Sequence, residues 1–167
     1  SIFKLKRNQL EKFNKIYRKD EQLAFIKKLD ADKSWESNLK NENDYQTHAT
    51  EILIPKLNNG TYLIFASLEN DENTFAFSSI QVTDLALVES DTEDYKSFQI
   101  IDRNNGKPIS GASIKLSYFQ NNNRNTKRED FSTNRYGEIQ VEKDNDRYRN
   151  VLAQVKYGND TAYFGDY

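Results

Sequence analysis

The chain has 167 residues, a length that fits one mid-sized domain or two small ones. Its formal net charge is −2, and its 24 basic and 26 acidic residues are interleaved, so no basic stripe points to nucleic acid or to an anionic membrane surface, and a mean hydropathy of −0.92 excludes a membrane span. The absence of cysteine excludes disulfides, thiolate metal sites and cysteine nucleophiles, and the absence of methionine and of a signal-peptide pattern leads us to interpret the chain as a piece of a longer protein whose targeting segment lies elsewhere.

The first thirty residues differ from the rest of the chain. Residues 1–5 are predicted to form a short strand, and Asn8 with Glu11 makes a plausible capping pair for a helix. A second helical segment is expected to start at Asp20. Apolar residues recur every three to four positions in both segments, which favours packing on the protein's own sheet over a partner-binding face: Leu10, Phe13, Ile16, Tyr17, Leu23, Ile26 and Leu29.

From residue 33 the apolar period changes to two, which predicts strands. We expect strands at residues 35–39 and 45–54, and a third at 61–69 after the turn signal Asn58-Asn59-Gly60. The run at residues 73–89 is too long for one ordinary strand, so we expect it to bend or split near Ser78-Ser79.

Residues 89–97 contain four acidic residues and are the best candidate for a linker, with a domain boundary within about five residues of Thr92. Six further strands are predicted at 97–102, 111–119, 128–133, 137–143, 150–158 and 160–167. The fold class is therefore mainly β, with two consecutive antiparallel β-sandwich domains, 1–91 and 92–167, the first carrying the short helical segment.

The segment from Asp102 to Gly111 concentrates turn chemistry. Asn105-Gly106 supplies positive φ at low cost, Pro108 belongs at a strand start or edge, and Gly111 permits a bulge before the next strand resumes. These residues reverse one strand and offset the next, which is a structural role.

The same stretch resembles a motif of bacterial extracytoplasmic β-domains, in which a strand ends in Asp, turns through G-x-P and re-enters as G-A-x-V. The carboxypeptidase-regulatory-like domain and the macroglobulin domain of bacterial α2-macroglobulin-like proteins share it. Four other pieces are similar to the macroglobulin pattern, in order along residues 52–165: Ile54–Leu63, Val82–Leu87, Thr133–Glu138 and Tyr157–Ala162. The chain thus resembles the α2-macroglobulin-like family of Bacteroidetes-type envelope proteins.

That resemblance implies scaffold domains of a large protease trap that is exported to the periplasm or anchored to the outer membrane. The implied partners are neighbouring domains of the same chain and, through the longer protein, target proteases. The cysteine–glutamine thioester of many members is impossible here, and no functional residue of the family carries over. The alternative is a carboxypeptidase-regulatory-like or adhesin-type module that binds glycan or protein.

No residue is predicted to be catalytic, cofactor-binding or metal-binding, and no cofactor is expected. His48 lacks a G-x-S-x-G partner, and the oxygen-rich segments 70–73 and 144–146 lack the ligand spacing of a calcium loop. We interpret the aromatic residues near the C-terminus, Tyr157, Tyr163, Phe164 and Tyr167, as core or interdomain residues. A seam between the two domains is expected from Leu85, Leu87, Val88, Tyr95 and Phe98.

Overall fold

The structure is a computed structural model that describes residues 1–38, 44, 46–69, 71–120, 126–143 and 148–165. The chain divides into two compact units, residues Ser1–Val82 and Thr83–Tyr167. Neither described helix is long or apolar enough to cross a membrane.

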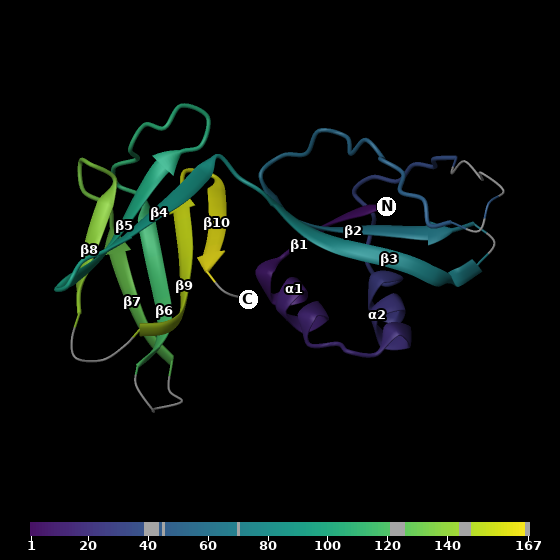
Figure 1. Ribbon diagram of the computed structural model, residues 1–167, viewed down its shortest axis with the longest axis horizontal. Coiled ribbons are helices and arrows are strands. Elements are labelled where there is room, and N and C mark those ends of the chain that lie inside the picture. Colours follow the sequence, from purple (N-terminus) through teal and green to yellow (C-terminus); the bar gives the residue numbers. More distant parts are fainter. Residues whose placement is uncertain (39–43, 45, 70, 121–125, 144–147, 166–167) are drawn as a thin grey trace. The chain divides into compact units, whose positions relative to one another are not determined.

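The first unit contains strands β1 (Ile2–Leu5), β2 (Gly60–Leu68) and β3 (Asp71–Val82), together with helices α1 (Arg7–Asn14) and α2 (Lys19–Ile26). The strands form one antiparallel sheet in the order β1-β2-β3. Both helices lie on the same side of this sheet (Figure 1). Within the described residues, helices rather than a second sheet make the other layer of this unit.

Helix α1 has Lys6 as its N-cap, two residues before the predicted cap at Asn8. Gln9 accepts a hydrogen bond from the backbone N–H of Lys6 (2.8 Å), whereas Glu11 pairs with Arg7 one turn away (2.8 Å). The predicted Asn8–Glu11 capping pair is therefore wrong, because Asn8 already lies inside the helix. Asp20 likewise lies inside α2, whose N-cap is Arg18.

Part of the predicted apolar stripe packs on the sheet, and Ile16 and Leu23 are half-buried. Leu10, Phe13 and Ile26 are buried in a cluster with residues of β1 and β2. Phe13 makes ring contacts with Phe25 (5.5 Å between centroids) and with Phe77 of β3 (4.9 Å). Tyr17 is 90% exposed, because α1 ends at Asn14.

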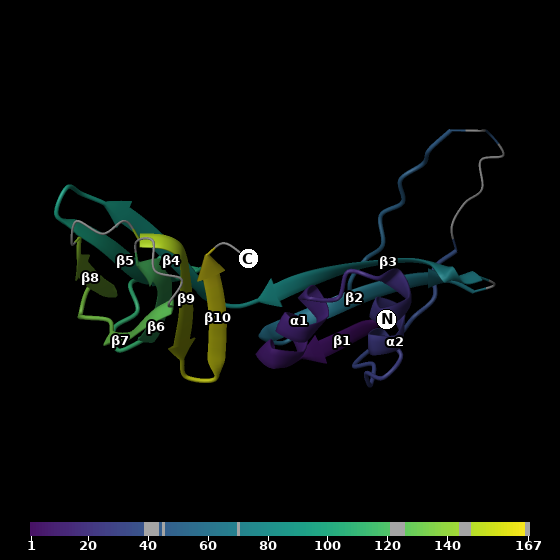
Figure 2. The ribbon, with the colours of Figure 1, turned by 90° about the horizontal axis from the view of Figure 1, so that it is seen from below.

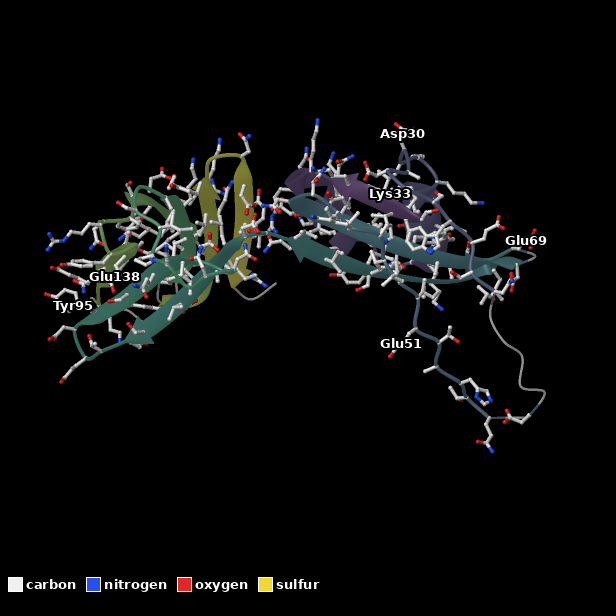
Figure 3. The ribbon with its side chains drawn as sticks, turned by 90° about the horizontal axis from the view of Figure 1, so that it is seen from above. Asp30, Lys33, Glu51, Glu69, Tyr95 and Glu138 are labelled. Carbon is white, nitrogen blue, oxygen red and sulfur yellow. The ribbon has the colours of Figure 1, made fainter. Side chains whose placement is uncertain are left out.

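The connection from α2 to β2 corrects two predicted strands. Its described residues, 34–38 and 46–59, form no strand, and residues 39–43 and 45 lie outside the described residues. The connection is tied down near its ends, where the Lys33 ammonium donates to the Lys56 carbonyl (3.0 Å) and the Tyr62 hydroxyl donates to the Asn58 carbonyl (2.8 Å). Figure 2 and Figure 3 show its middle, around Glu51, projecting from the sheet. The alternating apolar and polar residues of this connection do not form the predicted strands, because no neighbouring strand in the described residues pairs with them.

The second unit is a sandwich of two antiparallel sheets, ordered β4-β5-β8 and β10-β9-β6-β7. Its strands are β4 (Leu85–Asp91), β5 (Tyr95–Asp102), β6 (Ser113–Gln120), β7 (Thr126–Ser132), β8 (Glu138–Glu142), β9 (Tyr148–Tyr157) and β10 (Asp160–Gly165). Each of the six strands predicted beyond residue 96 is present, and the mainly β, antiparallel fold class is confirmed.

The core of this unit draws on both sheets. Alternate residues of β6, Ile114, Leu116 and Tyr118, are at most 1% exposed and face residues of the opposing sheet such as Ile100. This is the inward–outward alternation of a sandwich strand. Because the two faces interdigitate, each strand of the unit has a fixed register.

The unit boundary corrects the predicted one. β3 continues through Ser78-Ser79 without a break, and the chain leaves strand geometry at Thr83-Asp84 instead. Residues 89–97 are the tip of the β4–β5 hairpin, in which Asp91 faces Lys96. The predicted boundary after residue 91 therefore falls inside a hairpin, because β4 pairs with β5 along its whole length.

The predicted interdomain seam also needs correction. Leu85 and Phe98 are each 2% exposed and belong to the core of the second unit, and Leu87 packs against that core. Val88 and Tyr95 are 45% and 41% exposed. The inward-facing residues of the β4–β5 hairpin pack in the core of the second unit. They are core residues of one domain and not residues of a seam between two.

The turn-rich segment does what its chemistry predicts. Gly106 and Gly111 adopt φ of 70° and 74°, and Pro108 forms an isolated bridge with Ile101. Thr133 anchors the returning chain, because its hydroxyl donates to the Ile109 carbonyl (2.7 Å) and accepts from the Ala112 N–H (2.8 Å).

Candidate functional site

His48 lies on the projecting connection of the first unit. Its Nε2 is 2.5 Å from the Asp44 carboxylate, and both side chains are more than two-fifths exposed. An exposed pair of this kind contributes little to stability. The structure therefore gives His48 a surface contact on a segment without regular structure.

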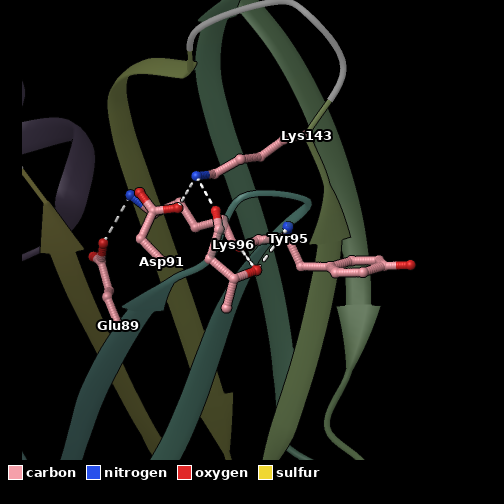
Figure 4. A network of polar contacts seen from close by, with 6 residues as sticks. Glu89, Asp91, Tyr95, Lys96 and Lys143 are labelled. Atoms are coloured by element: carbon pink, nitrogen blue, oxygen red, sulfur yellow. Dashed lines mark hydrogen bonds and ion pairs between the residues drawn. The ribbon is translucent and has the colours of Figure 1, made fainter.

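The acidic hairpin tip is a network of charge pairs (Figure 4). Lys96 pairs with Glu89 (3.0 Å), and Lys143 from the end of β8 pairs with Asp91 and donates to the Thr92 carbonyl (2.5 Å). Figure 4 shows the Tyr95 ring pointing away from these charges. The acidic hairpin tip is thus held against the end of β8 by Lys143.

Lys127 on β7 has a pKa raised above its ordinary value, first by Glu129 (3.1 Å) and then by Tyr118. A lysine is already protonated at neutral pH, and the raised pKa moves its deprotonation still further from neutrality. A permanently charged lysine cannot act as a general base.

Only part of the first oxygen-rich segment lies within the described residues. Asp71 accepts a hydrogen bond from the Thr74 hydroxyl (2.5 Å), which closes a short turn. Asn70 and residues 144–147 lie outside the described residues. Within the part of the chain that is described, no group of three or more His, Cys, Asp or Glu side chains is arranged to hold a metal ion.

A buried carboxylate holds the segment where the second unit begins. Asp160, 9% exposed at the start of β10, accepts hydrogen bonds from the Thr83 hydroxyl (2.8 Å) and the Asp84 N–H (2.8 Å). The Thr83 hydroxyl oxygen in turn accepts the N–H of Leu85 (3.1 Å). We call Thr83, Asp84 and Asp160 the Thr83 anchor.

The turn between β5 and β6 also forms hydrogen bonds with Asp84. The N–H of Arg103 donates to the Asp84 carbonyl (2.7 Å), and the Asn104 side chain donates to the Asp84 carboxylate (3.0 Å). A hydrogen bond to an ionised carboxylate is stronger than one between two neutral groups. The first residues of the unit are therefore fixed at both backbone and side chain before β4 begins.

Two motifs of the family resemblance meet in this anchor. Val82–Leu87 supplies Thr83 and Asp84, and Tyr157–Ala162 supplies Asp160. Sequence reasoning used both motifs to identify a family and missed that they contact each other. The signal that marks the contact is a polar pair, Thr-Asp, directly before a strand, together with an Asp two residues after a turn glycine.

The C-terminal aromatic residues are divided between core and surface. Phe164 packs against the core of the second unit, Tyr163 is half-buried, and Tyr157 is 49% exposed. Tyr167 lies outside the described residues. The interpretation as core residues is confirmed for Phe164.

No protein-family model matches the chain, and no curated protein matches its sequence. Two solved structures have a similar fold, both of native α2-macroglobulin from Escherichia coli. The fragment spanning domains MG0-NIE-MG1 has a TM-score of 0.63 and 16% identity over 98% of this chain and 53% of that one. The fragment spanning NIE-MG1 has a TM-score of 0.63 and 14% identity over 98% and 80%.

At these identities the likeness shows the fold alone. This chain spans about half the length of the larger fragment. The two units therefore have an architecture similar to that of α2-macroglobulin domains, which supports the macroglobulin-like interpretation of the sequence motifs.

Proposed function

We propose that this chain is a non-catalytic scaffold segment of a large α2-macroglobulin-like protease inhibitor of the bacterial cell envelope. Both similar fragments contain NIE followed by MG1, and each match covers 98% of this chain. We therefore assign residues 1–82 to an NIE-like unit and residues 83–167 to an MG1-like unit. The Bacteroidetes-type origin indicated by the motifs is part of this proposal.

The observation that carries the proposal is the Thr83 anchor. A protease trap converts one cleavage into movement of domains, which requires units that move as stiff bodies. Asp160 binds the first two residues of the second unit, so displacement of the chain at this point is passed to β10 and the sandwich. A rigid attachment of this kind suits a scaffold.

The proposal extends to partners and location. The chain binds neighbouring domains of its own longer protein and meets target proteases through that protein. It has no turnover of its own and takes no cofactor. The longer protein is exported and resides in the periplasm or on the outer membrane, which cell fractionation with an antibody against this segment tests.

The functional test uses the complete product of the gene that encodes this segment. It is incubated with an endopeptidase, whose activity is then measured on a small chromogenic peptide and on a large protein substrate. A trap leaves the first activity intact and lowers the second, because the enclosed protease is shielded from large molecules. If both activities persist, or both fall together, the protein is not a trap.

The variant Asp160→Ala links this assay to the segment. We expect it to weaken trapping while the isostere Asp160→Asn, which keeps an acceptor oxygen, weakens it less. Equal trapping by the wild type and both variants would show that the anchor has no part in the mechanism.

A further inference from the structure

Strand β3 of the first unit has an open edge. It lies last in the order β1-β2-β3, so that no strand among the described residues pairs with its outer side. The strand is 12 residues long and presents a row of backbone N–H and C=O groups there. A segment that binds to a sheet edge must be an extended strand, because only an extended strand can form hydrogen bonds with a row of backbone N–H and C=O groups.

Among the described strands, four of the five other edges are protected by charge, by shortness or by a neighbouring segment, and the fifth, β10, is half as long as β3 and has one charged residue, Asp160. β7 carries four consecutive charged residues, Lys127–Asp130, and β8 is five residues long with a glutamate at each end. β4 ends in Glu89 and Asp91, and β1 has a bridge from Lys33. In β3, residues 74–82 contain neither charge nor proline. Natural edge strands usually carry one of these protections against pairing with another chain.

An aromatic row ends at this unprotected edge. The ring of Phe65 on β2 lies 5.6 Å from that of Phe75 on β3, and the rings of Phe75 and Phe77 stack at 6.5 Å. Phe77 is 40% exposed although it contacts Phe13 below it. A strand added beside β3 extends the row if it carries large apolar residues at alternate positions.

We propose that the edge of β3 binds the β3 edge of a second copy of this chain, as an antiparallel strand pair. Residues 74–82 of β3 are themselves uncharged and rich in apolar residues, so this part of the strand can pair with the same part of a second copy without charge repulsion. A two-fold antiparallel pair places Phe75 and Phe77 of both copies on one face. It brings no like charges together between residues 74 and 82.

The strength of the pair follows from its size. Stable protein interfaces bury at least about 1,200 Å² in total, and a single pair of strands with two flanking rings buries less. The dimer is therefore weak and transient. It forms at high concentration and dissociates on dilution.

Two edge serines make a matched pair for the test. Ser78 on β3 and Ser132 on β7 are both exposed, and each lies on an edge strand. We expect Ser78→Lys to weaken self-association at least about tenfold, because it places two lysines near each other in the pair. Ser132→Lys leaves it unchanged. Sedimentation equilibrium from about 10 to 500 µM measures both effects.

The lack of native cysteine allows a direct check of the contact. Ser78→Cys forms a disulfide-linked dimer under mild oxidation, whereas Ser132→Cys does so much more slowly. Circular dichroism confirms that each variant keeps the wild-type fold. A wild type that stays monomeric at every concentration overturns the proposal, and so do equal cross-linking rates or equal effects of the two lysine variants.

Discussion

The two units differ in how their sheets find partners. In the second unit two sheets face each other, and the core draws on six of its strands. In the first unit one sheet carries helices on one face, and the connection around residues 46–59 has an alternating pattern without a strand. A segment of alternating apolar and polar residues therefore forms a strand only where a turn brings it beside another strand with which it can pair.

The helical layer gives the sharpest test of the first unit. Phe13 is 2% exposed and touches Phe25 and Phe77, so Phe13→Ala is expected to cost about 3–5 kcal/mol. The control Tyr17→Ala changes a side chain that is 90% exposed, so we expect less than about 0.5 kcal/mol.

The single tryptophan, Trp35, lies in the first unit, so its fluorescence during urea unfolding reports on that unit. The account expects Phe13→Ala to move this transition and Tyr17→Ala to leave it in place. Similar shifts for both variants would mean that the helices do not hold the sheet.

The turn glycines test the second unit. Gly137 has φ of 73°, and an added Cβ would lie 2.5 Å from the Ile100 carbonyl oxygen, so Gly137→Ala is expected to cost about 3 kcal/mol. Gly106 has φ of 70° with open space around it, so Gly106→Ala is expected to cost about 1 kcal/mol.

Far-ultraviolet circular dichroism during urea unfolding compares these two glycine variants, and Trp35 fluorescence serves as the internal control. A Gly137→Ala variant that is no less stable than Gly106→Ala would show that the close approach at Ile100 is absent in solution.

The Thr83 anchor has a smaller expected effect. Asp160→Ala leaves the Thr83 hydroxyl and the Asp84 N–H without their acceptor, which costs about 2 kcal/mol. Asp160→Asn keeps an oxygen acceptor and is expected to cost about 1 kcal/mol. Equilibrium unfolding of the second unit measures both values, and the reverse order of the two variants would argue against the hydrogen-bonding scheme.

The projecting connection has the smallest expected effect on stability. Leu53 is 92% exposed, so Leu53→Ser is expected to change the unfolding free energy by less than about 0.5 kcal/mol. The same exposure makes it a site of nicking under native conditions. A protease that cuts beside large apolar residues should cleave first within residues 46–59 and more slowly in the variant. A first cut inside the second unit would contradict this comparison.

Much of the second unit was predictable from its sequence. Residues 102–111 and 133–137 specify their turns through glycine, proline and asparagine, and β6 between them alternates buried Ile114, Leu116 and Tyr118 with outward residues. The boundary was not predictable in the same way. An acidic stretch such as residues 89–97 has the composition of a linker, and only its pairing within the β4–β5 hairpin and with Lys143 shows that it is a turn.

The candidate site shows the same limit. Thr83 and Asp160 each belong to a motif that the sequence presents, but they are 77 positions apart, and their contact depends on how β10 is placed in the sandwich. In the first unit, the alternation at residues 45–54 met the local requirements of a strand. Whether a strand forms also depends on a partner strand far away in the sequence, and the local alternation of apolar and polar residues does not reveal that partner.

The extent of the second unit is the most direct test of the account. β4 pairs with β5 along its length, and Leu85 is 2% exposed in the core, so the unit should need every residue from Thr83. Two fragments, 83–167 and 92–167, are compared by urea unfolding and by amide chemical-shift dispersion. The account predicts that 83–167 folds cooperatively and that 92–167, which lacks β4, does not. If 92–167 folds as stably as 83–167, the unit begins after residue 91 and the Thr83 anchor is not part of it.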